Sequence, residues 1–248
     1  MKKDNTIGNV LSQTIFSDHA IELAKDVVEN HGNVDLLKDV PIVSYAVSLL
    51  RIKDYFRDQW LLRKMAIFIM NVSRNLVTDE DRQKAINHFF ESEESSKEEL
   101  NYLLIILDRY VEENKALFLA LVYCSFIRGE IDIYLLKIFA ESISHFLPGD
   151  SDTLRNGEQI YEGYSNVPDS MLRLASLDLM QKIVKIINDS SKMENSNFKD
   201  GAAILPYENG SVFKYTEIGL KLRKILFPAV AETDGIIAID MRQALYMM

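Results

Sequence analysis

Side chains that could catalyse a reaction or hold a metal are scattered along this 248-residue sequence. The four histidines, His19, His31, His88 and His145, lie far apart, and no two share the i, i+4 spacing of a helical metal site. We expect each of them at a helix end or on the surface. The one cysteine, Cys124, stands in an apolar stretch without a neighbouring base, which is typical of a small buried residue. Phosphate-binding glycine loops and serine-hydrolase motifs are absent from the sequence. The sequence therefore predicts a protein that is not an enzyme and that uses neither a metal nor a cofactor.

Charge is unevenly distributed along the chain. The 28 lysines and arginines against 37 aspartates and glutamates leave a net charge of −9, which argues against a protein that coats nucleic acid. Residues 41–76 nevertheless hold six basic and two acidic side chains, whereas residues 77–114 hold four basic and eleven acidic ones. Either the two segments face each other within the fold, or the basic one binds an anionic surface such as nucleic acid, lipid headgroups or an acidic protein. The partner-binding candidates in the basic segment are Arg51, Lys53, Arg57, Trp60, Arg63 and Lys64.

Hydrophobic periodicity and capping residues predict helices through most of the first 147 residues. Ser17 precedes an amphipathic stretch that ends at His31-Gly32, where glycine is typical of a helix C-terminus. Overlapping capping boxes at Ser95 and Ser96 predict the start of a leucine-rich helix. We expect about seven helices with short connections, packed as an antiparallel bundle over residues 1–148.

The rest of the chain has a different pattern. Turn residues predict a linker over residues 149–167, followed by a helix over residues 169–187. Asn209-Gly210 lies between two β-rich runs, residues 203–207 and 211–216, and so predicts a β-hairpin turn. The expected fold class is therefore mainly α, with the helical bundle followed by a small α+β unit over residues 168–248. The apolar tail at residues 236–248 either docks as a last helix or strand or binds a partner.

The order of helix, loop, hairpin and helix over residues 168–227 resembles the C-terminal part of a winged-helix module. Tyr215-Thr216-Glu217-Ile218-Gly219 resembles the junction after the wing, where Thr caps the next helix and Gly permits close packing on the sheet. Nine basic and seven acidic residues between Val167 and Val230 leave little net positive charge, so the resemblance favours a protein-interaction module over a DNA reader. If the unit does bind DNA, its candidate contacts are Lys214, Lys221, Arg223 and Lys224.

A second resemblance covers more of the chain. Residues 39–50, residues 58–69, the helix with Asp108-Arg109, and the stretch at 128–131 resemble a family of uncharacterised helical proteins of bacteria and their prophages. Such proteins often sit among phage-encoded or phage-defence genes, and the family has no established catalytic residues, so the resemblance implies a context rather than a chemistry. More weakly, residues 127–132 with Glu141 resemble the inter-helix turn of tellurite-resistance helical domains, whose acidic residues can bind metal; here Arg128 interrupts that turn.

The sequence also bears on where the protein is located and on what it does. The two N-terminal lysines are not followed by the apolar stretch of a signal peptide, and no apolar run reaches the ~20 residues of a spanning helix. We therefore expect a cytoplasmic protein. The leading hypothesis is a non-enzymatic module that binds a protein partner, in a prophage or antiviral-defence context, with self-association left open. The alternatives are a DNA-binding transcriptional regulator and a peripheral binder of anionic membranes through residues 42–76.

Overall fold

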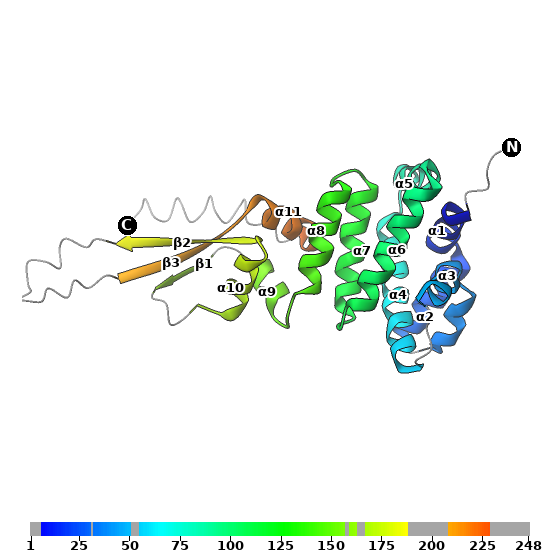
Figure 1. The fold of residues 1–248 in the computed structure, drawn as a ribbon, viewed down its shortest axis with the longest axis horizontal. Coiled ribbons are helices and arrows are strands. Elements are labelled where there is room, and N and C mark those ends of the chain that lie inside the picture. Colours follow the sequence, from blue (N-terminus) through cyan, green and yellow to red (C-terminus); the bar gives the residue numbers. More distant parts are fainter. Residues whose placement is uncertain are drawn as a thin grey trace, which may run out of the picture. The chain divides into compact units, whose positions relative to one another are not determined.

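The computed structural model describes residues 6–30, 32–50, 55–156, 159–162, 167–187 and 208–228. The chain divides into two compact units, Met1–His145 and Phe146–Met248, which we call unit 1 and unit 2 (Figure 1). In its described part, the chain is mainly α-helical with one small antiparallel sheet, as the sequence predicts. The elements of unit 1 are α1 (Thr6–Phe16), α2 (Asp18–Glu29), the 3₁₀ helix η1 (Val34–Asp39), α3 (Pro41–Leu50), α4 (Tyr55–Asn75), α5 (Asp79–Glu91), α6 (Glu93–Arg109), α7 (Asn114–Ile127) and α8 (Ile133–Ser144).

Polar residues with extended backbone start several helices of unit 1. The side chain of Ser17 accepts a hydrogen bond from the N–H of Ala20 at the start of α2, and Thr78 caps α5 in the same way. The prediction that α6 starts at Ser95 or Ser96 is wrong, because Ser92 is its N-cap and accepts from the N–H of Ser95. The hydroxyl of Ser96 instead donates to the carbonyl oxygen of Phe89, 3.1 Å away, and so ties α6 to the end of α5.

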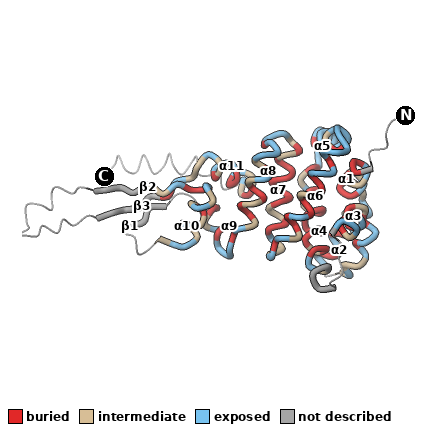
Figure 2. Tube along the Cα trace, viewed as in Figure 1, coloured by how far each residue is buried: buried red, intermediate tan, exposed pale blue. Residues whose placement is uncertain are grey.

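The core of unit 1 runs along α4, α6 and α7, where Figure 2 shows the buried positions. Helix α4 packs against α2 and α7, and α7 also packs against α8. Helix α7 is apolar on nearly all sides, which is expected for a helix surrounded by others. Burial of these helices supplies most of the driving force for folding, and it fixes where the polar side chains on their outer faces lie.

Unit 2 begins earlier than the sequence predicts. Its elements are α9 (Asp150–Asn156), β1 (Gln159–Glu162), α10 (Asp169–Ser176), β2 (Met180–Ile187), β3 (Glu208–Tyr215) and α11 (Glu217–Leu226). The predicted linker over residues 149–167 is therefore wrong, because this stretch contains α9 and β1. Strand β1 pairs with β3 through Gln159 and Phe213, so it belongs to the sheet of unit 2. Isolated turn residues mark the ends of these short elements but do not exclude the elements themselves.

The predicted helix over residues 169–187 is also wrong, because it is two elements. Helix α10 ends at Ser176, and Asp178, with a φ of 57°, turns the chain into β2. Four β-branched residues in β2 favour an extended backbone over a helix: Ile183, Val184, Ile186 and Ile187. An apolar run of this length is compatible with either structure, and pairing with β3 decides for the strand.

Asn209-Gly210 does not form the predicted hairpin turn. Both residues lie inside β3, where Asn209 pairs with Ile186 and Gly210 pairs with Lys185. The sheet has the order β1-β3-β2, and both of its pairings are antiparallel. The connection between β2 and β3, which includes the predicted strand at 203–207, lies outside the described residues. An eight-residue ladder with β2 outweighs the local turn preference of an Asn-Gly pair.

The junction after β3 is built as its resemblance implies. The hydroxyl oxygen of Thr216 accepts from the N–H of Gly219 at 3.0 Å and caps α11, while the N–H of Thr216 donates to the carbonyl oxygen of Leu179. A Cβ on Gly219 would lie 1.8 Å from that same carbonyl oxygen, so only glycine is accommodated. Both structural roles predicted for this motif, the cap and the close packing, are confirmed.

Candidate interaction surface

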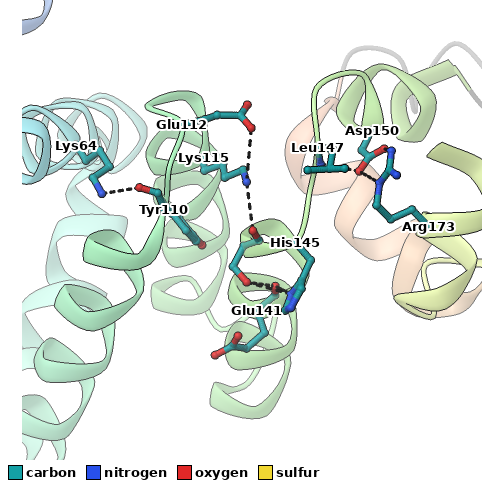
Figure 3. Close-up of polar contacts among 10 residues, drawn as sticks. Lys64, Tyr110, Glu112, Lys115, Glu141, His145, Leu147, Asp150 and Arg173 are labelled. Carbon is teal, nitrogen blue, oxygen red and sulfur yellow. Dashed lines mark hydrogen bonds and ion pairs between the residues drawn. The ribbon is translucent and has the colours of Figure 1, made fainter. Parts of the chain in front are cut away.

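Lys64, predicted to meet a partner, is an internal side chain. It is 3% exposed, and its ammonium nitrogen donates to the carbonyl oxygen of Tyr110 at 2.6 Å (Figure 3) and to that of Asp108 at 3.2 Å. Both carbonyl groups lie at the C-terminal end of α6, where backbone acceptors lack partners within the helix and a positive charge is favourable. Lys64 therefore fixes the end of α6 to α4 and is unavailable to an external anion.

Two other cations of the basic segment are engaged in ion pairs within unit 1. The guanidinium Nε of Arg63 lies 2.8 Å from a carboxylate oxygen of Glu113, and Arg74 is paired with Glu29. Arg63 and Glu113 belong to the basic and acidic segments respectively, so at this point the two segments do face each other. Arg51 and Lys53 lie outside the described residues, as does the side chain of Arg57.

Trp60 keeps the exposure expected of a binding residue. Its side chain is 54% exposed, one helical turn before Arg63 and Lys64 on α4. The turn between α6 and α7 carries Val111, which is 80% exposed. Residues on both sides of Val111 are held to α4, because Lys64 binds the carbonyl oxygen of Tyr110 and Arg63 binds the carboxylate of Glu113. We call these four residues, Trp60, Arg63, Val111 and Glu113, the Trp60–Val111 surface.

The turn that carries Val111 is held to α8 as well. The hydroxyl of Tyr110 donates to the carbonyl oxygen of Ala140 at 3.0 Å, and the ammonium group of Lys115, which is 5% exposed, donates to the carbonyl oxygen of Ser144 at 3.2 Å (Figure 3). Arg109 forms an ion pair of 2.9 Å with Glu141 on α8. The α6–α7 turn is therefore fixed from both sides, and Val111 projects from a well-held backbone.

A second polar cluster joins α5, α6 and α7. The carboxylate of Glu99, whose side chain is 4% exposed, accepts from the hydroxyl of Tyr123 and contacts Nε2 of His88, each at 2.6 Å. Burial raises the pKa of the Tyr123 phenol well above its ordinary value. The sequence placed His88 at a helix end or on the surface, and His88 does lie in the last turn of α5, but the sequence did not predict this cluster. The available signal was the helical spacing that puts Glu99 on the same face as Ser96 and Leu103, both of which are buried.

Cys124 has no sign of nucleophilic activation. The residue is buried, and burial raises the pKa of its thiol to about 12, an effect that the charge of Arg128 only partly opposes. Arg128, in the turn that weakly resembles tellurite-resistance domains, donates to Asp81 at 3.3 Å and to the carbonyl oxygen of Asn75. Within the described residues, no group of three or more His, Cys, Asp or Glu side chains is placed to hold a metal ion. No helix in the same part of the chain is long and apolar enough to cross a membrane.

The cations predicted to contact nucleic acid in unit 2 are not equivalent. Lys214, Lys221 and Lys224 are exposed, whereas Arg223 is 4% exposed. The guanidinium of Arg223 donates to the carbonyl oxygen of Arg155 through Nε and Nη2, at 3.2 and 2.9 Å. The Cζ atom of the same guanidinium lies 5.1 Å from the ring centre of Tyr215. Arg223 thus connects α11 to the end of α9 and does not face solvent as the prediction requires.

An ion pair between a buried carboxylate and a half-buried guanidinium holds α9 and α10 together in unit 2. Asp150 is fully buried, and its carboxylate accepts two hydrogen bonds from Arg173, at 2.7 and 2.8 Å, and one from the N–H of Leu147 (Figure 3). Such a bidentate pair fixes both side chains in one geometry. Arg173 is the one arginine of α10, so its use here leaves this helix without a guanidinium to offer a base edge.

Comparison with known proteins gives no match: no family model, no curated protein and no solved structure is similar to this chain. The described residues form a mainly α-helical protein of two units, and unit 1 carries two exposed apolar side chains, Trp60 and Val111. The functional proposal therefore rests on the exposure of Trp60 and Val111 and on the contacts that Lys64 and Arg63 make with the α6–α7 turn.

Proposed function

We propose that this chain is a non-enzymatic interaction module that binds a protein partner through the Trp60–Val111 surface. The observation that carries the proposal is the exposure of Trp60 and Val111, 54% and 80%, beside a turn that Lys64 and Arg63 hold in place. The resemblance to helical proteins of bacteria and prophages supports a prophage or antiviral-defence context, and a cytoplasmic location goes with it.

The composition of this surface suits protein recognition. Tryptophan and arginine are the residues most enriched among those that dominate binding energy at interfaces, and such residues are typically ringed by polar groups. Here the Arg63–Glu113 ion pair, with its side chains 31% and 29% exposed, supplies polar groups three positions after Trp60 and two positions after Val111 along the chain. Because these two charges neutralise each other, the expected partner offers an apolar contact with a polar edge rather than a strongly charged one.

Rigidity of the surface also favours binding. An interface residue that must be ordered on binding costs affinity, whereas one that is already held costs little. The hydrogen bonds of Lys64, Tyr110 and Lys115 connect the α6–α7 turn to α4 and α8 before any partner arrives. Truncating an anchor of this kind typically costs about 2 kcal/mol of binding free energy, or roughly a thirtyfold loss of affinity.

The experiment compares proteins captured from the native host by the wild-type chain and by the double variant Trp60→Ser, Val111→Ser. The matched control is Tyr134→Ser, which removes a 69% exposed aromatic side chain from α8 of the same unit. We expect at least one captured protein to be lost with the double variant and kept with the control, and to bind the purified wild-type chain directly. Equal capture of every protein by all three chains would contradict binding through the Trp60–Val111 surface. Turnover of a nucleotide or nucleic acid that one carboxylate substitution abolishes would contradict the non-enzymatic proposal.

A DNA-binding regulator remains the alternative function, and the three exposed lysines of unit 2 favour it. Lys221 and Lys224 lie one turn apart on α11, and Lys214 lies on β3. Against it, α10 is the one described helix between β1 and β2, whereas helix-turn-helix readers use a pair. Salt-sensitive retention of duplex DNA that is lost in Lys221→Glu, Lys224→Glu would favour this function, and no retention at low salt would exclude it.

Peripheral binding to anionic membranes is the weaker alternative. Its cations were to come from residues 42–76, but Lys64 is buried there, and Arg63 and Arg74 are paired with carboxylates. Trp60 still provides an exposed aromatic side chain. Flotation with vesicles that contain anionic lipid tests this function, and equal flotation of wild type and Trp60→Ser would exclude a role for the segment.

A further inference from the structure

Helix α5 is attached to unit 1 by few apolar side chains. Its buried residues are Asp81, Ala85 and Phe89, so only two apolar side chains of its thirteen residues are buried. Polar contacts add to these: Asp81 binds Arg128, the carbonyl oxygen of Phe89 accepts from Ser96, and His88 binds Glu99. Two contacts with aromatic rings contribute as well, since His88 makes an edge contact with Phe126 and the guanidinium of Arg82 lies over the ring of Phe16. A helix with this little buried apolar surface depends on such contacts more than its neighbours do.

The contact between His88 and Glu99 is the one that a proton can change near neutral pH. Glu99 is a nearly inaccessible carboxylate on α6 that contacts Nε2 of His88 on α5 at 2.6 Å. The second donor to this carboxylate is the phenol of Tyr123 on α7, also at 2.6 Å. A protonated imidazole neutralises the buried charge and forms a charge-assisted hydrogen bond, which is roughly twice as strong as a neutral one. A neutral imidazole can still donate Nε2–H to the carboxylate, but it no longer neutralises the carboxylate's charge, so the ion pair is lost.

We propose that the His88–Glu99 contact is a proton-dependent latch that holds α5 against α6 and α7. Release of the proton weakens the latch and lets α5 open, which exposes the apolar side chains of Ala85 and Phe89. The latch is independent of the Trp60–Val111 surface, so either proposal can fail without the other.

The charges around His88 set the direction of the response. Burial lowers the pKa of His88, but the hydrogen bond and negative charge of Glu99, together with the charge of Glu91 on α5 itself, outweigh it and raise the pKa above its ordinary value. Tyr123 and Phe126 approach from α7, and α1, which packs on α5, has no titratable side chain along Thr6–Phe16. A histidine with a raised pKa stabilises the folded state at acidic pH, and this stabilisation is lost as the pH rises through the raised pKa. The latch is therefore closed in mild acid and weakened in mild base.

Amide hydrogen exchange of the full chain at about pH 6 and about pH 9 tests the latch, since these values lie below the ordinary histidine pKa and well above it, as the raised pKa of His88 requires. Protection of α5 is measured relative to α4, which contains no histidine, so that the intrinsic effect of pH on exchange cancels. We expect relative protection of α5 to fall at the higher pH in the wild type. We expect His88→Gln, which keeps a neutral donor, to give the same relative protection at both values.

Two further measurements keep the proposal falsifiable. His19→Gln removes an exposed histidine from α2 and should retain the wild-type response. If His88→Gln does not fold, the NMR titration of the His88 ring in the wild type must coincide with the loss of α5 protection. Equal protection of wild-type α5 at both pH values, a response that persists in His88→Gln, or a ring titration separate from the exchange transition would each overturn the latch.

Discussion

The ammonium group of Lys64 lies 2.6 Å from the carbonyl oxygen of Tyr110, with both groups removed from solvent. This one contact connects the middle of the basic segment to the end of the acidic one. Lys64, which the sequence marks as a partner-binding candidate, therefore caps the C-terminal end of α6. The charge segregation of the sequence is thus, at Lys64 and Arg63, part of the internal structure of unit 1.

Replacing Lys64 with methionine should destabilise unit 1. The substitution keeps much of the side-chain volume but removes the donor to two carbonyl oxygens, and hydrogen bonds from charged donors contribute roughly 1.5–3 kcal/mol. We expect the free energy of unfolding, measured with urea, to fall by about 2 kcal/mol. The control Lys97→Met, at an exposed site on α6, should change it by less than about 0.5 kcal/mol. Equal effects of the two substitutions would contradict the role assigned to Lys64.

Replacing Gly219 with alanine should disrupt unit 2. The added Cβ would lie 1.8 Å from the carbonyl oxygen of Leu179, so α11 must move away from the start of β2. Overpacking of this kind costs at least about 1–3 kcal/mol, and here the clash is with backbone that cannot rotate away. Gly129→Ala is the informative comparison, because Gly129 has a φ of 77° but no atom within 4 Å of the added Cβ. A thermal-unfolding midpoint lowered more by Gly129→Ala than by Gly219→Ala would show that the close approach is not what requires glycine.

The buried thiol of Cys124 should be chemically silent in the folded protein. With its pKa raised to about 12 by burial, almost none of the thiol is ionised near neutral pH, and the thiolate is the reactive form. We expect iodoacetamide at about pH 8 to label the native chain far more slowly than the chain unfolded in guanidinium chloride. Mass spectrometry of timed samples measures both rates. Rapid labelling of the native chain would mean that the region around α7 opens readily.

Glu99 and Tyr123 should be energetically coupled. Each is buried, and their 2.6 Å hydrogen bond gives the carboxylate one of its two observed partners. In a double-mutant cycle of Glu99→Gln and Tyr123→Phe, we expect a coupling energy of about 2 kcal/mol, within the range for hydrogen bonds to charged groups. The cycle uses free energies of unfolding at one fixed pH below neutrality, where the imidazole of His88 is charged. Additive effects of the two substitutions would place the phenol and the carboxylate apart.

Elements that depend on local pattern were predictable. The cap at Ser17 and the Thr216–Gly219 junction are read directly from residue type and spacing because a cap involves only its own helix end. Residues 169–187 were not predictable in this way, because an apolar run packs equally well as a buried helix or a strand until β3 lies beside it.

Of the two apolar residues of the candidate site, one could be predicted from the sequence and the other could not. The sequence marked Trp60 as a partner-binding candidate in the basic segment, and the structure leaves its side chain exposed. Val111 gave no signal, because a single valine in a polar turn resembles any other loop residue. Val111 is a candidate because Lys64 and Arg63, which lie on a different helix, hold its turn in place.

By itself the sequence determined the mainly helical class, the change of pattern after residue 148 and the capped junction at Thr216, since each depends on neighbours within a few positions. Only the tertiary structure decided that Lys64 is a buried cap and that Arg223 faces inward. It also decided that Glu99 and Asp150, unlike most acids of the described residues, are buried. The residue type of a charged side chain does not indicate whether that side chain is exposed to water or hydrogen-bonded to a buried carbonyl oxygen. The difference is set by which helices pack over it, through the burial of apolar faces that lie far apart along the chain.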